Sequence, residues 1–202
     1  LVAVFVAIFA PVIAPYSTTK ISVMNALKGP TLDHPLGTDN LGRDQLSRVM
    51  YGVRMSMLVA GTPISAALVI GVLLGLISGD FGRWLDELIM RLMDVLYAFP
   101  DLLLALALVA TFGTGLRGLI VAIAVGRIPG FARVTRATVL SIRENEYVEA
   151  ARTVGLRDWQ IIWRHILPNG LAPIIVMLSI NLALAILVEA SLSFLGLGIQ
   201  PP

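Results

Sequence analysis

Cysteine is missing from this 202-residue sequence, which excludes disulfide bonds and thiolate metal sites. The two histidines, His34 and His165, are too few and too distant in the chain to suggest a metal cluster. Charge is also scarce, because Asp, Glu, Lys and Arg make up 14% of the residues, where soluble domains have about a quarter. The two signs interleave and the net charge is only +2, which argues against a nucleic-acid partner.

A complete nucleotide-binding motif is absent too. The spacing Gly37-x4-Gly42 matches the start of a phosphate-binding P-loop, but Arg43 and Asp44 follow where Lys and then Ser or Thr are required. We therefore interpret residues 16–50 as a structural loop with Asp and Gly turn chemistry. We expect no cofactor and no metal bound by this chain.

The motifs of an intramembrane enzyme are incomplete as well. The sequence has no Gly-x-Ser-x-Gly motif, both histidines lie outside the apolar segments, and Ser78-Gly79-Asp80 has no matching second Asp motif. A membrane enzyme stays an alternative without a catalytic set. A channel that works without ATP is a second alternative.

Long apolar segments are what the sequence does contain. Hydrophobic residues make up 57% of the chain and the mean hydropathy is +0.86. A spanning helix needs about 20 apolar residues, because the hydrocarbon core is about 30 Å thick. We predict an all-α membrane helix bundle with five spans visible: part of a first span at 1–14, then 55–78, about 95–112, 116–125 with its helix continuing to about 141, and 171–188.

Two of these segments carry helix-face patterns. Ala67, Gly71, Gly75 and Gly79 recur every four residues, so one face of the second span is small enough for close helix contact. That contact is either with another subunit or within this one. Residues 80–94 are amphipathic, and we interpret them as an interfacial helix that runs into the third span past Pro100.

Positive charge indicates the orientation. Nine of the 15 Lys and Arg residues lie in 80–94 and 127–164, which favours placing residues 142–169, here called the central segment, in the cytoplasm. Arg133, Arg136 and Arg143 share one side of a helix. A solvated or headgroup-facing side is the favoured explanation for these three arginines.

The central segment predicts a helix, a glycine turn and a second helix. Residues 142–153 favour helix and Gly155 interrupts it. Apolar residues from Trp159 to Ile166 then repeat at helical spacing, and Pro168 and Asn169-Gly170 end the second helix. Ala150 and Ala151 are small enough for a partner groove to close over them at low entropic cost. The alternative is a connecting loop.

The stretch Glu149-Ala150-Ala151-x3-Gly155, followed by Ile166-Leu-Pro168, resembles the EAA loop of ATP-binding cassette (ABC) importer permeases. From His34 on, the chain is similar to the second permease subunit of dipeptide, oligopeptide and nickel importers. The other matching pieces are His34-Pro-Leu-Gly-Thr-Asp-Asn-Leu-Gly-Arg-Asp44, Asp94-Val-Leu-Tyr-Ala-Phe-Pro100 and Glu189-Ala-Ser-Leu-Ser-Phe-Leu-Gly-Leu-Gly-Ile-Gln-Pro-Pro202. Arg127, inside the fourth span, departs from the expected apolar or aromatic residue.

This resemblance implies a type I permease fold with six spans in a bacterial or archaeal cytoplasmic membrane. It implies a homologous second permease as heterodimer partner, two cytoplasmic ATPases that carry ATP and Mg²⁺, an extracytoplasmic solute-binding protein and contact with membrane lipid. Residues 1–50 would then be a partial first span and an extracytoplasmic loop, and 51–202 the permease core. We expect a piece of a longer protein, without the start of the first span and the sixth span.

Three sets of candidate site residues follow. The resemblance makes the central segment the ATPase-docking surface, with Gly155 at a turn that a side chain would strain. Polar residues within spans are candidates for a translocation path, although Asp101 and Glu189 lie near span ends and Asn181 could bond a neighbouring helix. The sets are Glu149, Ala150, Ala151 and Gly155 for docking; Asp101, Asn181 and Glu189 for the path; and Asp39, Arg43 and Asp44 for contact with the binding protein.

Overall fold

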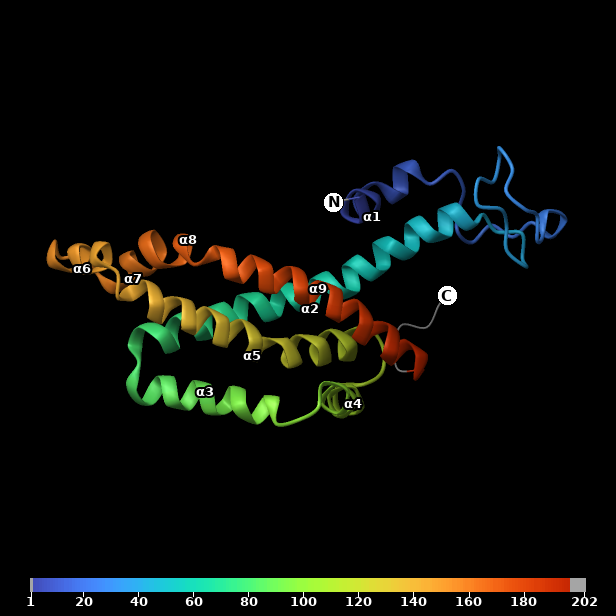
Figure 1. Ribbon diagram of the computed structural model, residues 1–202. Helices are drawn as coiled ribbons and strands as arrows, with labels where there is room; N and C mark the ends of the chain where they lie inside the picture. Colours follow the sequence, from blue (N-terminus) through green and yellow to red (C-terminus); the bar gives the residue numbers. More distant parts are fainter. Residues whose placement is uncertain (1, 197–202) are drawn as a thin grey trace. The chain divides into compact units, whose positions relative to one another are not determined.

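A computed structural model of the chain describes residues 2–196, and in them it is helical apart from loops and one isolated bridge between Thr38 and Asp44 (Figure 1). The chain divides into two compact units, Leu1–Val59 and Ala60–Pro202. The long helix α2 (Gln45–Phe81) begins in the first unit and ends in the second. The predicted all-α class is confirmed.

The first unit combines a short helix with an ordered loop. Helix α1 (Val2–Ile13) is apolar but has only 12 residues, which is shorter than a span. The loop that follows contains the short 3₁₀ helix η1 (Val23–Asn25) and ends where α2 begins. Gly37 and Gly42 have φ values of +75° and +72°, as the turn chemistry of the loop predicted.

The second unit is built around α5 (Leu116–Arg143). Among the described residues, three single helices are long and apolar enough to cross a membrane, namely α2, α5 and α9 (Leu171–Phe194). Within its most apolar window α5 is 61% buried, against 33% for α2 and 17% for α9, so α5 is the core helix. Figure 1 shows α3 and α9 running beside it.

Helices α3 (Arg83–Tyr97) and α4 (Asp101–Phe112) together are long and apolar enough for a span, but they are bent by 93°, as in a broken span or a re-entrant loop. The prediction of a helix that continues past Pro100 is therefore wrong. Pro100 lies at the N-cap of α4 with an extended ψ of 135°. Proline has no N–H to donate and disfavours helical backbone at the preceding residue, which is why the helix stops before it.

The arginine side of α5 bonds to other helices of the second unit: Arg133 stays exposed, as the expectation of a solvated side had it, whereas Arg136 and Arg143 are half-buried. Two guanidinium groups form ion pairs with carboxylates on α3, and the third donates to the end of α2. The bonds are Arg133 Nη2 to Asp94 Oδ1 at 2.5 Å, Arg136 Nε and Nη2 to Asp86 at 2.5 and 2.6 Å, and Arg143 Nη1 to the carbonyl of Gly79 at 2.9 Å.

The small face of α2 packs against α5, which decides between the two interpretations of that face in favour of contact within the chain. A Cβ added at Gly71, Gly75 or Gly79 would lie only 2.5 to 2.7 Å from the nearest atom of α5. The nearest atoms are Cβ of Phe131, the carbonyl O of Ala132 and Cβ of Val139. The two backbones therefore approach as closely as glycine permits.

We expect Gly75→Ala to destabilise the chain and Gly61→Ala, in the same helix, to leave it intact. The methyl group at position 75 meets backbone atoms of α5, and such overpacking costs about 1–3 kcal/mol. At Gly61 a Cβ meets nothing within 4 Å, so only the gain of helix propensity remains, about 1 kcal/mol. Thermal unfolding of the purified chain in detergent measures both; equal midpoints for Gly75→Ala and the wild type would contradict the contact.

Candidate functional site

The central segment has the predicted helix, turn and helix. Helix α6 (Glu146–Thr153) is followed by the turn at Gly155 and by α7 (Asp158–Ile161). The second helix then continues through the π-helical turn η2 (Ile162–Ile166) and α8 (Leu167–Asn169). The chain leaves this helix at Gly170, where α9 begins.

The backbone conformation at position 155 requires a glycine. Its φ is +85°, a left-handed conformation that side chains with a Cβ rarely adopt. Its N–H donates to the carbonyl of Arg152 at 2.9 Å, and the next N–H, of Leu156, donates to the carbonyl of Ala151 at 3.1 Å. These bonds satisfy carbonyls at the end of α6. A Cβ at this position would meet nothing within 4 Å, so the constraint comes from φ alone.

The three residues of the Glu-Ala-Ala motif do not face the same way. Glu149 and Ala150 are exposed, whereas Ala151 is only 8% exposed. Ala151 belongs to a buried apolar cluster with residues of α2, α5 and the second helix: Leu76, Val139, Val148, Ile161 and Ile166. Ala151 therefore joins the segment to the spanning helices, and closure of a partner groove over the two alanines stays a prediction.

Val154 is a surface residue that the sequence interpretation missed. It lies between α6 and Gly155 and is 84% exposed, although valine is apolar. Trp159 and Trp163, read from the sequence as one apolar stripe, are also more than half exposed. The available signal was an apolar residue next to a turn glycine, but Leu156, on the other side of that glycine, packs against the buried cluster instead.

The second helix ends at Asn169 with Gly170 as its cap, within the ending predicted at Pro168 and Asn169-Gly170, and Pro168 itself lies inside the helix. The N–H of Leu167 donates to the carbonyl of Ile162, five residues earlier, which defines the π-helical turn. Proline in a regular helix lacks an N–H and its ring crowds the carbonyl four residues back. The wider turn accommodates Pro168 inside the second helix, so this helix continues to Asn169 and is capped by Gly170.

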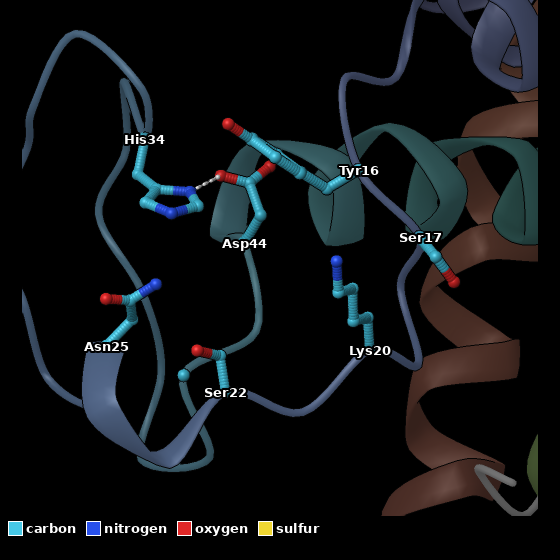
Figure 2. Close-up of a pocket in the computed structure, with 8 residues that line it drawn as sticks. Tyr16, Ser17, Lys20, Ser22, Asn25, His34 and Asp44 are labelled. Carbon is cyan, nitrogen blue, oxygen red and sulfur yellow. Dashed lines mark hydrogen bonds and ion pairs between the residues drawn. The ribbon is translucent and has the colours of Figure 1, made fainter.

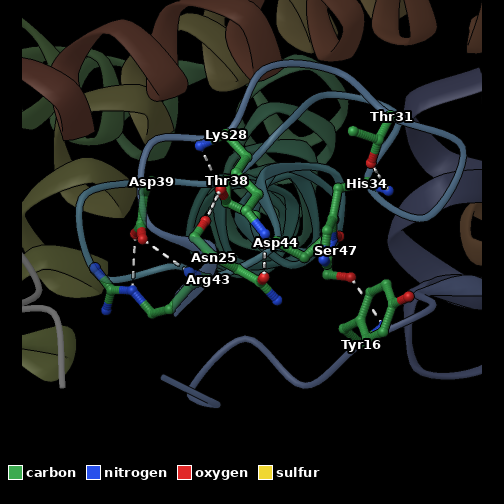
Figure 3. A network of polar contacts seen from close by, with 10 residues as sticks. All are labelled: Tyr16, Asn25, Lys28, Thr31, His34, Thr38, Asp39, Arg43, Asp44 and Ser47. Carbon is green, nitrogen blue, oxygen red and sulfur yellow. Dashed lines mark hydrogen bonds and ion pairs between the residues drawn. The ribbon is translucent and has the colours of Figure 1, made fainter. Parts of the chain in front are cut away.

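In the first unit, Asp39 organises the loop that precedes α2 (Figure 3). Its carboxylate accepts hydrogen bonds from the N–H groups of Leu41 and Arg43, both at 2.9 Å, and from Arg43 Nε at 2.8 Å. Arg48 forms a further ion pair with it. Burial raises the pKa of Asp39, but the donors of Arg43 and Leu41 outweigh burial and hold the pKa well below its usual range.

Asp44 is the second internal carboxylate of this loop. It accepts from the N–H of Ser47 at 2.8 Å and pairs with Nδ1 of His34 at 2.9 Å, at the edge of a polar pocket of about 110 Å³ (Figure 2). Burial raises the pKa of Asp44, and the Ser47 and His34 bonds lower it further than burial raises it. Its stabilising effect is thus complete above the usual carboxyl pKa of about 3.9 and is lost as the pH falls through the lowered value.

These contacts bear on the residues predicted to touch a binding protein. Asp39 and Asp44 are buried and already bonded within the loop, and Arg43 is half-buried. Their contact with a binding protein stays a prediction, but the structure gives the two carboxylates a structural role. Exposed apolar residues of the same loop, such as Met24 and Leu32, are the more accessible part.

The three candidates for the translocation path each bond to a different partner. Asp101, in the first turn of α4, forms an ion pair with Arg127 of α5 at 3.1 Å. Asn181 is buried and donates to the carbonyl of Met177 in its own helix at 2.9 Å, so the bond to a neighbouring helix is not seen. Glu189 accepts from the hydroxyl of Ser193 at 2.9 Å. Their place in a path stays a prediction.

Residues 71–202 match a family model described as "Binding-protein-dependent transport system inner membrane component". The chain belongs to this family. It is 45% identical to the dipeptide transport system permease protein DppC of Alkalihalophilus pseudofirmus, over 98% of the chain and 66% of that protein. It is 42% identical to the glutathione transport system permease protein GsiD of Pectobacterium atrosepticum (100% and 67%) and to the di/tripeptide permease DppC of Pseudomonas aeruginosa (100% and 69%).

The chain thus spans about two thirds of the length of these relatives. A solved structure of the MetNI methionine ABC transporter in inward-facing conformations shares the fold, with a TM-score of 0.59 at 22% identity over 72% of this chain and 71% of that one. Together these similarities confirm the predicted family of ABC importer permeases and its helical fold. They also confirm the interpretation as a multi-pass transporter subunit rather than an enzyme.

We expect Asp39→Asn to loosen the loop of the first unit, and Asp33→Asn to leave it unchanged. The amide keeps an acceptor but removes the charge that binds Arg43 and Arg48, whereas Asp33 is an exposed carboxylate of the same loop. Amide hydrogen exchange over residues 37–44 measures the change. Equal protection in the two variants would contradict the structural role of Asp39.

We expect Ala151→Glu to destabilise the chain while Ala150→Glu is tolerated. A glutamate at position 151 puts a charge into the buried cluster, which costs about 2 kcal/mol or more. The same side chain at position 150 stays in solvent and changes stability by less than about 0.5 kcal/mol. Thermal unfolding in detergent compares the midpoints of the two variants. A lower midpoint for Ala150→Glu than for Ala151→Glu would show that Ala150, not Ala151, lies in the buried cluster.

Proposed function

We propose that this chain is the permease subunit of an ATP-driven importer of short peptides in a bacterial or archaeal cytoplasmic membrane. The names of its relatives support the substrate class, since they specify dipeptides, di- and tripeptides, and glutathione, which is itself a tripeptide. This favours peptides over nickel. The whole transporter would contain a homologous permease, two ATPases that hold ATP and Mg²⁺, and a solute-binding protein outside the membrane.

The observation that carries the proposal is the construction of the central segment. Its tip, from Glu149 to Gly155, exposes Ala150 and Val154. Its base is buried, because Ala151 and Val148 contact the cluster that contains Leu76 of α2 and Val139 of α5. A partner bound at the tip would therefore act on two spanning helices at once.

This arrangement suits an energy source in another chain. The sequence has no complete P-loop, so ATP hydrolysis falls to the partner ATPases. Closure of the ATPase pair would move the tip, and the buried base would pass that movement to α2 and α5 as a packed unit. Contact of the ATPase with Val154 adds apolar area to a surface otherwise made by Glu149 and Ala150.

We expect Gly155→Val to abolish peptide-stimulated ATP hydrolysis and uptake, and Gly155→Asn to keep most of both. Valine is strained at φ +85°, whereas asparagine tolerates left-handed backbone, and neither side chain meets a neighbour within 4 Å at Cβ. The complete complex in proteoliposomes, supplied with loaded binding protein, measures both activities. Full coupling in Gly155→Val, or uptake that persists without ATP, would refute the proposal and favour a channel.

A further inference from the structure

An ion pair lies beside the break between α3 and α4. Helix α3 ends at Tyr97, α4 begins at Asp101, and the carboxylate Oδ2 of Asp101 is 3.1 Å from Nη2 of Arg127 on α5. A small cavity of about 10 Å³ adjoins the two side chains, which is room for about one water molecule. Charged residues and an interrupted helix thus occur at the same place in the second unit.

This place lies within the membrane. Helix α5 has 28 residues and is therefore about 42 Å long, longer than the hydrocarbon core of about 30 Å. Arg127 is about 16 Å along that helix from Leu116, so it falls inside the core in every placement in which α5 extends across the whole core. Ionisable residues at such depth pair with one another and mark substrate or ion pathways.

The two partners differ in exposure. The side chain of Arg127 is 15% exposed, whereas that of Asp101 is 50% exposed on this chain. A half-exposed carboxylate facing lipid tails is unfavourable, because lipid offers no hydrogen-bond donors. The open side of Asp101 therefore faces either water in a path or a polar group of another subunit.

We propose that Asp101 is a contact in the translocation path for the positively charged amino terminus of the transported peptide. Arg127 is the positioning residue: its guanidinium holds the carboxylate of Asp101 in place at this break while remaining mostly buried itself. A carboxylate accepts several hydrogen bonds, so an ammonium group can bind Asp101 without displacing Arg127. This inference rests on the proposed peptide import and adds the substrate group that is recognised.

Three variants of the reconstituted complex test the inference. Asp101→Asn removes the charge, Asp101→Glu keeps it, and the double variant Asp101→Leu with Arg127→Leu replaces the whole pair by apolar side chains. Apolar replacement of a buried pair is often neutral for folding, so the double variant is expected to assemble normally. Subunit recovery, peptide-stimulated ATP hydrolysis and uptake are measured for each.

We expect wild-type recovery in all three variants, uptake reduced about tenfold in Asp101→Asn and in the double variant, and most uptake kept in Asp101→Glu. Uptake of a dipeptide is also compared with uptake of its N-acetylated form, each at a concentration that saturates the binding protein. The wild type is expected to prefer the free amino terminus, and Asp101→Asn to lose that preference.

Three results would overturn the inference. Wild-type uptake in the double variant would show that the pair is structural only, and loss of the second permease from the complex would show that Asp101 faces a subunit interface. A preference for free amino termini that survives in Asp101→Asn would place recognition elsewhere. Failure of the proposed function is separate, because it would appear as absent ATP-driven uptake in the wild type itself.

Discussion

The close contact between α2 and α5 is the constraint on which the second unit depends. Three glycines of α2 let its backbone approach α5 to a distance that no side chain permits. With no hydrophobic driving force between helices in lipid, such contact supplies van der Waals attraction over a long interface. The buried cluster at the base of the central segment uses residues from both helices, so it exists only where α2 and α5 meet.

Features that depend on a few neighbouring residues could be predicted from the sequence. The small face of α2 follows from spacing, and the turn at Gly155 from one glycine between two helix-forming stretches. The break at Pro100 was missed although its cause is local, because proline is tolerated in membrane helices when neighbours satisfy the backbone. Here the chain turns by 93° instead of continuing.

Features that depend on distant residues could not be predicted. Arg136 and Asp86 are 50 residues apart, and their bidentate pair half-buries an arginine of α5 that was expected in solvent. Ala151 looked equivalent to Ala150 until Val139 of α5 was seen beside it. Asp39 likewise matched an exposed contact residue by type, while its burial depends on how the whole loop closes around it.

The glycine face of α2 repeats every four residues, and so it repeats about every 6 Å along the helix axis. A periodic surface sets how near α5 comes but accepts it equally well one repeat further along. The position along the axis must then be set by contacts that occur once. The bond from Arg143 to the last of the three glycines is such a contact, and so is Asp86 of α3, which accepts from both Ser78 of α2 and Arg136 of α5. The distance and the register between α2 and α5 thus depend on different kinds of residue. A substitution can therefore alter the distance without altering the register, or the register without altering the distance.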